Sequence, residues 1–299
     1  MYLRYFGYSF FLFLSTGLLS SCEHQNFKAP SKVVPLTRTH IKVSKPLDFV
    51  PGNETLLVSL QPYLGSETEN DEIAHLHLDS AGRPLALIDQ SGITHKSSKI
   101  RLVWRKVPLL KPQRLSRRVI GPFASFESVN RAYLKLKELG KQGTIARPNE
   151  WEIWFSEEEE LPLDIKSSLW TRNIKHQVKP FLKSSTGEIS LSGIIKIQAL
   201  DGLKWKGGIY QGPFYLLPDA YGTWTFVEKT PLERYLRGVV PHEIGFKAPF
   251  TAISAQAVLA RTWAIANSHR FEIDGYHLCS DTQCQVYKDP AKANQAVAF

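Results

Sequence analysis

The sequence is poor in several features that define protein classes. Its 299 residues include three cysteines and one methionine, which excludes a disulfide-dense small scaffold and a methionine-rich binding surface. One stretch, residues 6–19, is apolar enough to approach a bilayer. Because that stretch is short for a transmembrane helix, a protein with many membrane spans is excluded. The sequence contains neither a zinc-finger spacing nor an RNA-binding signature.

The composition is that of a folded, basic protein. Hydrophobic residues make up 43% of the chain and charged residues 22%, which leaves enough apolar surface to exclude disorder of the whole chain. There are 37 Lys and Arg against 28 Asp and Glu, for a formal net charge of +9. Acidic envelope polymers and anionic lipid headgroups are the expected counter-charges, and nucleic acid is not. A solvated surface that keeps the protein soluble is the alternative.

The first 22 residues have the pattern of a secretory signal. Arg4 precedes a short apolar run that ends in Leu19-Ser20-Ser21-Cys22. This ending resembles a bacterial lipobox, which implies a lipid on Cys22 and an exported protein. Such a protein would be held at the outer face of the cytoplasmic membrane or in the periplasm or cell envelope. The alternative is an uncleaved signal anchor in which Cys22 has no special part.

The next segments divide into a linker and a strand-rich region. Residues 23–52 contain four prolines and few aromatics, as expected of a spacer. Residues 53–115 show short strand patterns separated by turns. Near residue 75, Leu76 and Leu78 alternate with His75 and His77, so both histidines share one face. We interpret that face as exposed and polar rather than metal-binding, because no third ligand is near.

Residues 116–156 predict a small βαβ-like unit. Residues 118–123 form a strand pattern, and Ser125 is placed to cap a helix whose apolar spacing continues to Leu139. Two further strands are expected at residues 144–146 and 151–155. The order resembles a SPOR (sporulation-related repeat) module, which implies binding to glycan stripped of its peptides. A generic small α/β subdomain is the alternative.

A charge run at Glu157–Glu160 is expected to be a linker to a last domain, residues 162–299. More strands are expected up to residue 230. Thr230-Pro231-Leu232-Glu233 then has the form of a capping box with proline at the first helical position. The helix is predicted to end at Pro241. A second helix is expected from about residue 249 to 268, and its many alanines suggest close packing on several sides.

Glu243 is the most suggestive candidate for catalysis. We expect it in the connection between these two helices, after Pro241 and beside apolar residues. A carboxyl group in partly apolar surroundings can hold a proton near neutral pH and donate it. Arg261 is surrounded on its helix by apolar residues, so its guanidinium must be paired if it is buried. The alternatives for Glu243 are a surface loop residue or the salt-bridge partner of Arg261.

Three ordered motifs then carry a specific resemblance: TPLERYLRGVVPHE at residues 230–243, AQAVLARTWA at 255–264 and DTQCQVY at 281–287. They resemble the signatures of the SpoIID/LytB family, which contains stage II sporulation protein D and the amidase enhancer. The resemblance covers roughly residues 190–299. It implies an α+β fold, with a mixed sheet plus helices in this C-terminal domain, after the strand-rich part and the βαβ-like unit.

The resemblance also implies an activity, that of a lytic transglycosylase acting on denuded peptidoglycan strands. Glu243 is implied as the catalytic acid and then base, which yields a 1,6-anhydro-muramyl product. Arg261 is expected to orient Glu243 or grip the sugar. The substrate-binding candidates are Gln256, Gln285 and Tyr287.

Two other functions stay open. One is a non-catalytic peptidoglycan-binding enhancer of a cell-wall amidase, and the other is a structural envelope lipoprotein. Domains of the family usually continue beyond the point that corresponds to Phe299, so we expect either a truncated protein or an atypically short domain, which favours the enhancer.

The last candidate site contains His277, Cys279 and Cys284. Some members of the family carry zinc in this region, so the resemblance implies a structural zinc site with His269 as a possible fourth ligand. In an oxidising compartment, a disulfide between Cys279 and Cys284 is an equal alternative. The expected chemistry needs no cofactor.

Overall fold

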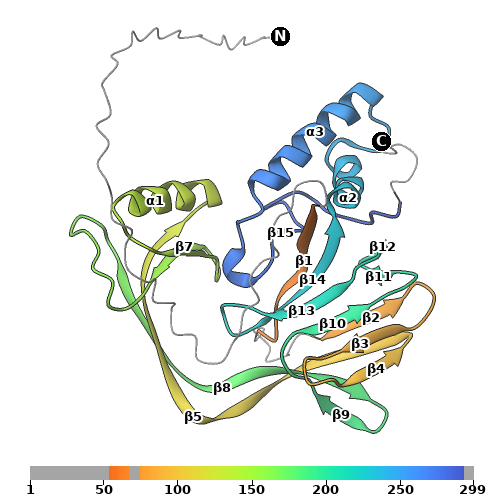
Figure 1. Cartoon of the computed structure of the whole chain (residues 1–299), viewed down its shortest axis with the longest axis horizontal. Coiled ribbons are helices and arrows are strands. Elements are labelled where there is room, and N and C mark those ends of the chain that lie inside the picture. The colour runs from red at the N-terminus through yellow and green to blue at the C-terminus, as the bar shows by residue number, and fades with distance from the viewer. Residues whose placement is uncertain (1–53, 67–74, 293–299) are drawn as a thin grey trace, which may run out of the picture. The chain divides into compact units, whose positions relative to one another are not determined.

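The computed structural model describes residues 54–66 and 75–292 (Figure 1). The predicted signal peptide, the lipidation site at Cys22 and the linker lie outside these residues. In the part of the chain that the structure describes, no helix has the length and apolar character needed to cross a membrane. The described residues all belong to one compact unit.

A seven-stranded sheet contains strands from both ends of that unit. Its order is β15-β1-β14-β13-β10-β3-β4, and only the β1–β15 pair is parallel. The longest pairing in this sheet, between β1 and β14, extends from Thr55 opposite Pro231 to Leu64 opposite Trp224, with shifts of register on either side of Gln61. The strands are β1 (Thr55–Leu64), β3 (Leu85–Ile88), β4 (Thr94–Ser97), β10 (Ile195–Gln198), β13 (Phe214–Pro218), β14 (Trp224–Pro231) and β15 (Leu278–Cys279).

A second sheet has the order β12-β11-β2-β5-β7-β6, with β8 paired to β5 and β9 to β8. β5 and β8 form a long two-stranded ribbon that joins the two ends of this sheet (Figure 1). The boundary expected between residues 115 and 116 falls inside β5. The strands are β2 (Leu76–Ser80), β5 (Lys99–Phe123), β6 (Thr144–Ala146), β7 (Trp151–Phe155), β8 (Ser168–Ser184), β9 (Gly187–Ser190), β11 (Leu203–Trp205) and β12 (Gly208–Tyr210).

Three α-helices complete an α+β fold, as predicted: α1 (Phe126–Glu138), α2 (Leu232–Ile244) and α3 (Phe250–Ala266), with a short 3₁₀ helix at Glu272–Asp274. The elements predicted for residues 116–156 are all present. Ser125 caps α1 by accepting a hydrogen bond from the backbone N–H of Ser128. The alternation at residues 75–78 is also confirmed, because Leu76 and Leu78 are buried while His75 and His77 are exposed.

The predicted boundaries of α2 are wrong at both ends. Thr230 and Pro231 belong to β14, so no capping box forms. The first helical N–H, that of Leu232, donates instead to the carbonyl of Glu54 (2.9 Å), a partner 178 residues away that sequence spacing cannot reveal. Pro241 does not end the helix but lies within it. The Gly238 carbonyl accepts a hydrogen bond from the backbone N–H of Lys288 (3.0 Å), so a neighbouring segment supports this turn.

α3 has the predicted length but is packed on one side only. Ile253, Ala257, Ala260 and Ala264 are buried against the core. The opposite side exposes large apolar side chains, at Phe250, Val258, Leu259 and Ile265. The expectation that the helix is enclosed on several sides is therefore wrong.

The larger core lies between the two sheets and under α2 and α3. Phe226 of β14 is fully buried there, stacked on Phe214 and tilted against Trp205, with ring centroids 5.5 and 5.2 Å apart. We predict that Phe226→Ala destabilises the protein by about 3–5 kcal/mol, because the truncation leaves a cavity between close-packed rings. Urea unfolding measures this change. Leu200→Ala, at a residue that is 71% exposed, is the control and is expected to cost less than about 0.5 kcal/mol.

Candidate functional site

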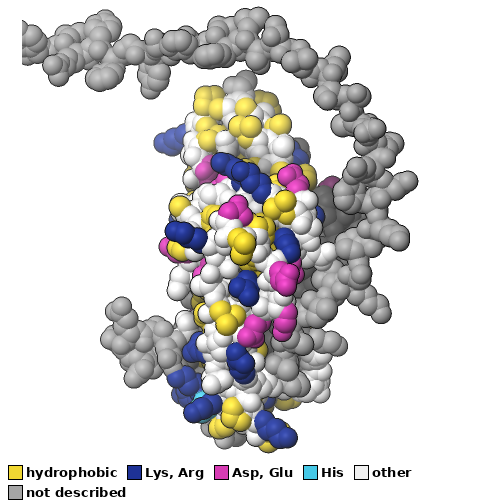
Figure 2. Space-filling model, turned by 90° about the vertical axis from the view of Figure 1, so that its left-hand side faces the viewer, with side chains coloured by type: hydrophobic (Ala, Val, Ile, Leu, Met, Phe, Trp, Pro, Cys, Tyr) yellow, Lys and Arg dark blue, Asp and Glu magenta, His cyan; other side chains and the backbone are white. Residues whose placement is uncertain are grey.

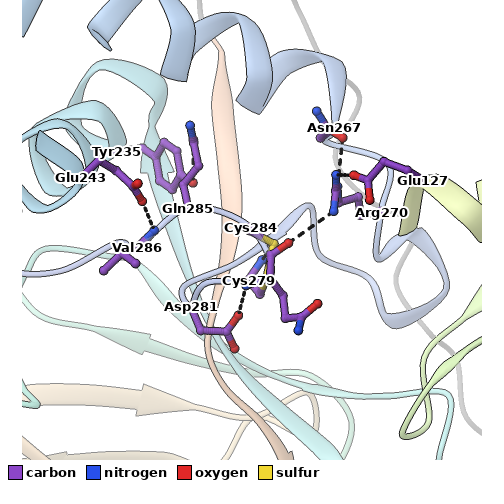
Figure 3. Close-up of a disulfide and its surroundings, with 11 residues drawn as sticks. Glu127, Tyr235, Glu243, Asn267, Arg270, Cys279, Asp281, Cys284, Gln285 and Val286 are labelled. Atoms are coloured by element: carbon purple, nitrogen blue, oxygen red, sulfur yellow. Dashed lines mark hydrogen bonds and ion pairs between the residues drawn. A yellow bond between two sulfur atoms is a disulfide. The ribbon is translucent and has the colours of Figure 1, made fainter. Parts of the chain in front are cut away.

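Glu243 lies in the last turn of α2, where its side chain is exposed. This corrects the sequence-based placement in an apolar connection between helices. Its Oε1 atom accepts a hydrogen bond from the backbone N–H of Val286 at 2.8 Å (Figure 3). The first and third sequence motifs therefore meet at this contact, although 43 residues separate the two partners.

Tyr235 and Gln285 lie behind this contact (Figure 3). The Tyr235 hydroxyl donates to Oε1 of Gln285 at 3.2 Å, and both side chains are buried. Burial raises the pKa of Tyr235, and the nearby charge of Glu243 raises it further. Tyr235 therefore stays protonated at neutral pH and keeps its donor hydrogen.

Tyr287 continues this buried group toward the sheet. Its ring stacks on that of Tyr235, with centroids 5.0 Å apart, and its hydroxyl donates to Oε2 of Glu228 at 2.9 Å. Glu228 is fully buried on β14. Its other oxygen, Oε1, accepts from the backbone N–H groups of Gln211 and Gly212, both at 3.0 Å. Burial raises the pKa of Glu228, while these hydrogen bonds act in the opposite direction.

Gly238 allows Tyr287 to approach α2 closely. A Cβ atom at Gly238 would lie 2.5 Å from the Tyr287 ring, closer than real carbon atoms come. Glycine within a helix costs about 1 kcal/mol relative to alanine, so its presence here is explained by the contact. The backbone bond from Lys288 to the Gly238 carbonyl fixes the same segment to the same turn.

Arg261 is paired with Glu233 and not with Glu243. Its Nε and Nη2 atoms donate to the two carboxylate oxygens of Glu233 at 2.9 and 2.8 Å, on the exposed side of α2 and α3. The alternative of a Glu243–Arg261 salt bridge is therefore wrong, and Arg261 does not orient Glu243 directly. Gln256 lies on α3 five residues before Arg261 and is half-buried, so these two side chains leave the helix in different directions.

Gln285 and Tyr287, two of the substrate-binding candidates, are buried in this structure. Gln285 is 9% exposed and Tyr287 is 1% exposed. A sugar bound at the surface could contact only a small part of either side chain. Oε1 of Gln285 accepts from Tyr235, and the Tyr287 hydroxyl donates to Glu228; binding of substrate by these two residues stays a prediction.

Cys279 and Cys284 form a disulfide with a Cα–Cα distance of 5.6 Å (Figure 3). Joined sulfurs provide no thiolate for zinc. The Nδ1 atom of His277 accepts the backbone N–H of Leu57 at 3.0 Å, and His269 packs edge-to-face on Phe126. No group of three or more potential metal ligands is found within residues 54–66 and 75–292. The arrangement therefore does not fit zinc, and of the two sequence-based alternatives the disulfide is the one present.

Glu243 is exposed, and it is not among the residues that line the cavity beside α2. The cavity beside α2 has a volume of about 220 Å³ and does not include Glu243; it is lined by Gln211, Arg234, Arg237, Pro290 and Ala291. Small-molecule pockets usually enclose about 300–1,000 Å³. The position of Glu243 on the exterior therefore suits a polymer that lies across the surface better than a small ligand that enters a pocket.

Sequence reasoning missed Glu228, Tyr235, Gly238 and Val286. Tyr235 is buried with the apolar residues of its helix, and at such a position the sequence gives no signal for the role of its hydroxyl. Glu228 does have a signal in the sequence, because it is a single acid among the apolar residues of β14. A carboxylate buried in a strand needs bonding partners, so such a residue indicates a buried polar group. Val286 contributes a backbone N–H, which has no signature in a side-chain pattern.

The comparisons with known proteins bear on the C-terminal part of the chain. Residues 220–298 match the family model of the stage II sporulation protein, SpoIID, which supports the resemblance over that region. An uncharacterized protein of Brachyspira hyodysenteriae is 33% identical over 122 residues, which is 39% of this chain and 31% of the relative. The chain therefore spans less than a third of that relative's length. No solved structure matches, and the comparisons do not show a SPOR likeness for residues 116–156.

We predict that Gly238→Ala disturbs the site although alanine is the better helix former. The added methyl group displaces Tyr287, and with it the Val286 N–H that binds Glu243. The expected loss of stability is about 1–3 kcal/mol, measured by urea unfolding. Arg237→Ala, one residue earlier and exposed, is the control. Equal or greater stability of Gly238→Ala would contradict the packing described.

Glu228 predicts a pH dependence of stability. Because its pKa is raised by folding, its contribution is fully present below the unfolded pKa, near 4.3, and is lost as the pH rises through the folded value. The melting temperature of the native protein is therefore expected to fall relative to that of Glu228→Gln as the pH rises above about 4. Calorimetry of both proteins across this range measures the difference. A difference in melting temperature between the two proteins that stays constant at every pH would refute this prediction.

Proposed function

We propose that this chain is a peptidoglycan lytic transglycosylase that cleaves denuded glycan strands, with Glu243 as general acid and base. One observation carries the proposal: an exposed carboxylate is fixed by a backbone N–H within the region that matches the SpoIID model. A carboxylate that must reach a polymer has to be accessible, and one that transfers a proton has to be positioned.

The chemistry needs a single carboxyl group. Protonated Glu243 donates its proton to the glycosidic oxygen as the bond from that oxygen to C1 of the muramic acid ring breaks. The carboxylate then takes the proton of the 6-hydroxyl of the same ring while O6 bonds to C1. The product is a 1,6-anhydro sugar, Glu243 is restored to its acid form, and water does not take part. Glycosidases that use water have a second carboxyl group for the other half of the reaction.

Three other acidic side chains of this region are buried or bonded elsewhere, which supports a reaction that uses the carboxyl group of Glu243 alone. Asp281 accepts a hydrogen bond from the backbone N–H of Gln283 through Oδ1, and Glu233 is held by Arg261. Glu228 is buried beneath the tyrosines. With Oε1 of Glu243 bound to the Val286 N–H, Oε2 is the atom that would carry the transferred proton.

The proposed setting is the cell envelope. A lipid on Cys22 would hold the protein at the outer face of the cytoplasmic membrane, and residues 23–52 would extend it toward the wall. Peptidoglycan strands are then the polymer within reach. The oxidised pair Cys279 and Cys284 agrees with a compartment outside the cytoplasm.

A second candidate is the enhancer of a cell-wall amidase, without catalysis of its own. The exposed apolar side of α3, which includes Val258 and Leu259, favours it. An apolar helix face suits contact with another protein better than contact with a hydrated glycan.

We predict that Glu243→Gln lowers the release of 1,6-anhydro-muramyl products from peptide-free glycan by roughly 10²–10⁴-fold, because the proton donor is lost. Mass spectrometry of the soluble products measures the release, and unfolding curves check that the fold is kept. Glu233→Gln is the matched control, since it removes a carboxylate from the same helix and leaves Glu243 in place. Undiminished anhydro product from Glu243→Gln would refute the proposal.

The amidase candidate has a separate readout. A paired Val258→Ser and Leu259→Ser variant is expected to lose stimulation of an amidase if the apolar side of α3 holds that partner. Glu243→Gln would keep the stimulation in that case. Stimulation by the native protein without any anhydro product would favour the enhancer over the transglycosylase.

A further inference from the structure

The β5–β8 ribbon carries charge of one sign. β5 contains eight Lys and Arg residues and β8 contains four, and neither strand contains Asp or Glu. Figure 2 views the molecule from the side of α1 and this ribbon. The lower part of that face, where β5 and β8 run in Figure 1, shows Lys and Arg side chains but no Asp or Glu. The net charge of the chain is therefore concentrated here more than its dispersed sequence positions suggest.

Partners from neighbouring segments offset the charge near the two ends of the ribbon. Arg105 pairs with Glu188 at 2.7 Å, and Arg114 pairs with Glu157 at 3.2 Å. Arg117 lies over the Trp154 ring, 3.3 Å from its centroid. These contacts give those arginines structural uses and remove them from the set available to a ligand.

The middle of the ribbon is different. Lys111, Arg172 and Lys175 are exposed, and none of the three makes an ion pair with any residue that the structure describes. Placing like charges close together is unfavourable unless a counter-charge arrives. This segment is therefore the part of the ribbon best suited to an anionic partner.

An apolar projection lies in the same segment. Pro108 is opposite His176 and Gln113 is opposite Ile174, so residues 109–112 bulge from β5 without strand partners. Leu110 in this bulge is fully exposed. Prolines at both sides, Pro108 and Pro112, restrict the backbone and lack an N–H that could pair with another strand.

We propose that this bulge is a membrane-contact site, at which Leu110 enters the interfacial layer of an anionic bilayer while Lys111 and Lys175 meet lipid phosphates. A leucine flanked by cations matches the two attractions that hold peripheral proteins at such bilayers. An anionic polymer would engage the cations but would leave Leu110 in water, so the projection favours lipid. The contact does not depend on the chemistry proposed for Glu243. It would supply the second attachment that a lipid chain needs for stable anchoring.

The test uses the full chain with Cys22→Ser and Leu110→Cys, and places an environment-sensitive fluorophore at residue 110 without reductant, so that the Cys279–Cys284 disulfide is kept. Vesicles consist of phosphatidylcholine alone or with added phosphatidylglycerol. On the anionic vesicles only, we expect the emission of the fluorophore to shift to the blue and to be quenched by brominated lipid. With Lys111→Gln and Lys175→Gln added, the lipid concentration needed for this blue shift is expected to rise by about tenfold or more.

The matched control carries the fluorophore at Leu134→Cys on α1. Leu134 is 48% exposed and is followed by Lys135, but it does not project from a strand. Its emission is expected to stay unchanged, even if another part of the chain holds the protein on the vesicle. The proposal is overturned if the emission of the probe at residue 110 does not shift, or if it shifts equally on neutral vesicles. It is also overturned if the probe responds to soluble polyphosphate but to no vesicle.

Discussion

The candidate site depends on the hydrogen bonds made by the buried carboxyl group of Glu228. Burying this group is costly unless its oxygens are satisfied, and three donors satisfy them: the N–H groups of Gln211 and Gly212 and the hydroxyl of Tyr287. The bond to Tyr287 fixes the segment that follows the disulfide. Tyr287 then stacks on Tyr235, and the preceding residue, Val286, presents its N–H to Glu243. An interior acid thus determines the position of an exterior one.

The two ends of the described chain cooperate in this arrangement. β1 pairs with β14, which carries Glu228, and also with β15, which leads into the disulfide and the segment bound to α2. The Leu57 N–H is bonded to His277, and the Glu54 carbonyl receives the first N–H of α2. A region matched from residue 220 onward therefore needs residues 54–64 to complete its sheet, which explains why the described residues pack as one unit.

Local patterns in the sequence predicted the parts of the fold that local physics determines. The cap at Ser125, the strands around residues 144–155 and the alternation at His75 and His77 depend on neighbours within a few residues, and all were predictable. The errors have distant causes. The segment at Lys288 is bonded to the Gly238 carbonyl of α2, and Arg261 is paired because Glu233 lies on another helix. Among the site residues, the motif predicts a role for Glu243, which stays a prediction, whereas the burial of Tyr287 depends on a glycine on another element.

The contrast between buried and exposed polar groups is the strongest structural argument about the substrate. The tyrosines, Gln285 and Glu228 are enclosed and satisfied, and none of them presents a binding surface. Glu243 alone of this group reaches the exterior, while the cavity beside α2 is small and lies elsewhere. A small substrate would gain little by binding at one exposed carboxylate, because its affinity comes from enclosure. A long glycan can gather contacts over many sugar units on both sides of the reacting bond. The exposed position of Glu243 therefore supports the proposal of a polymeric substrate.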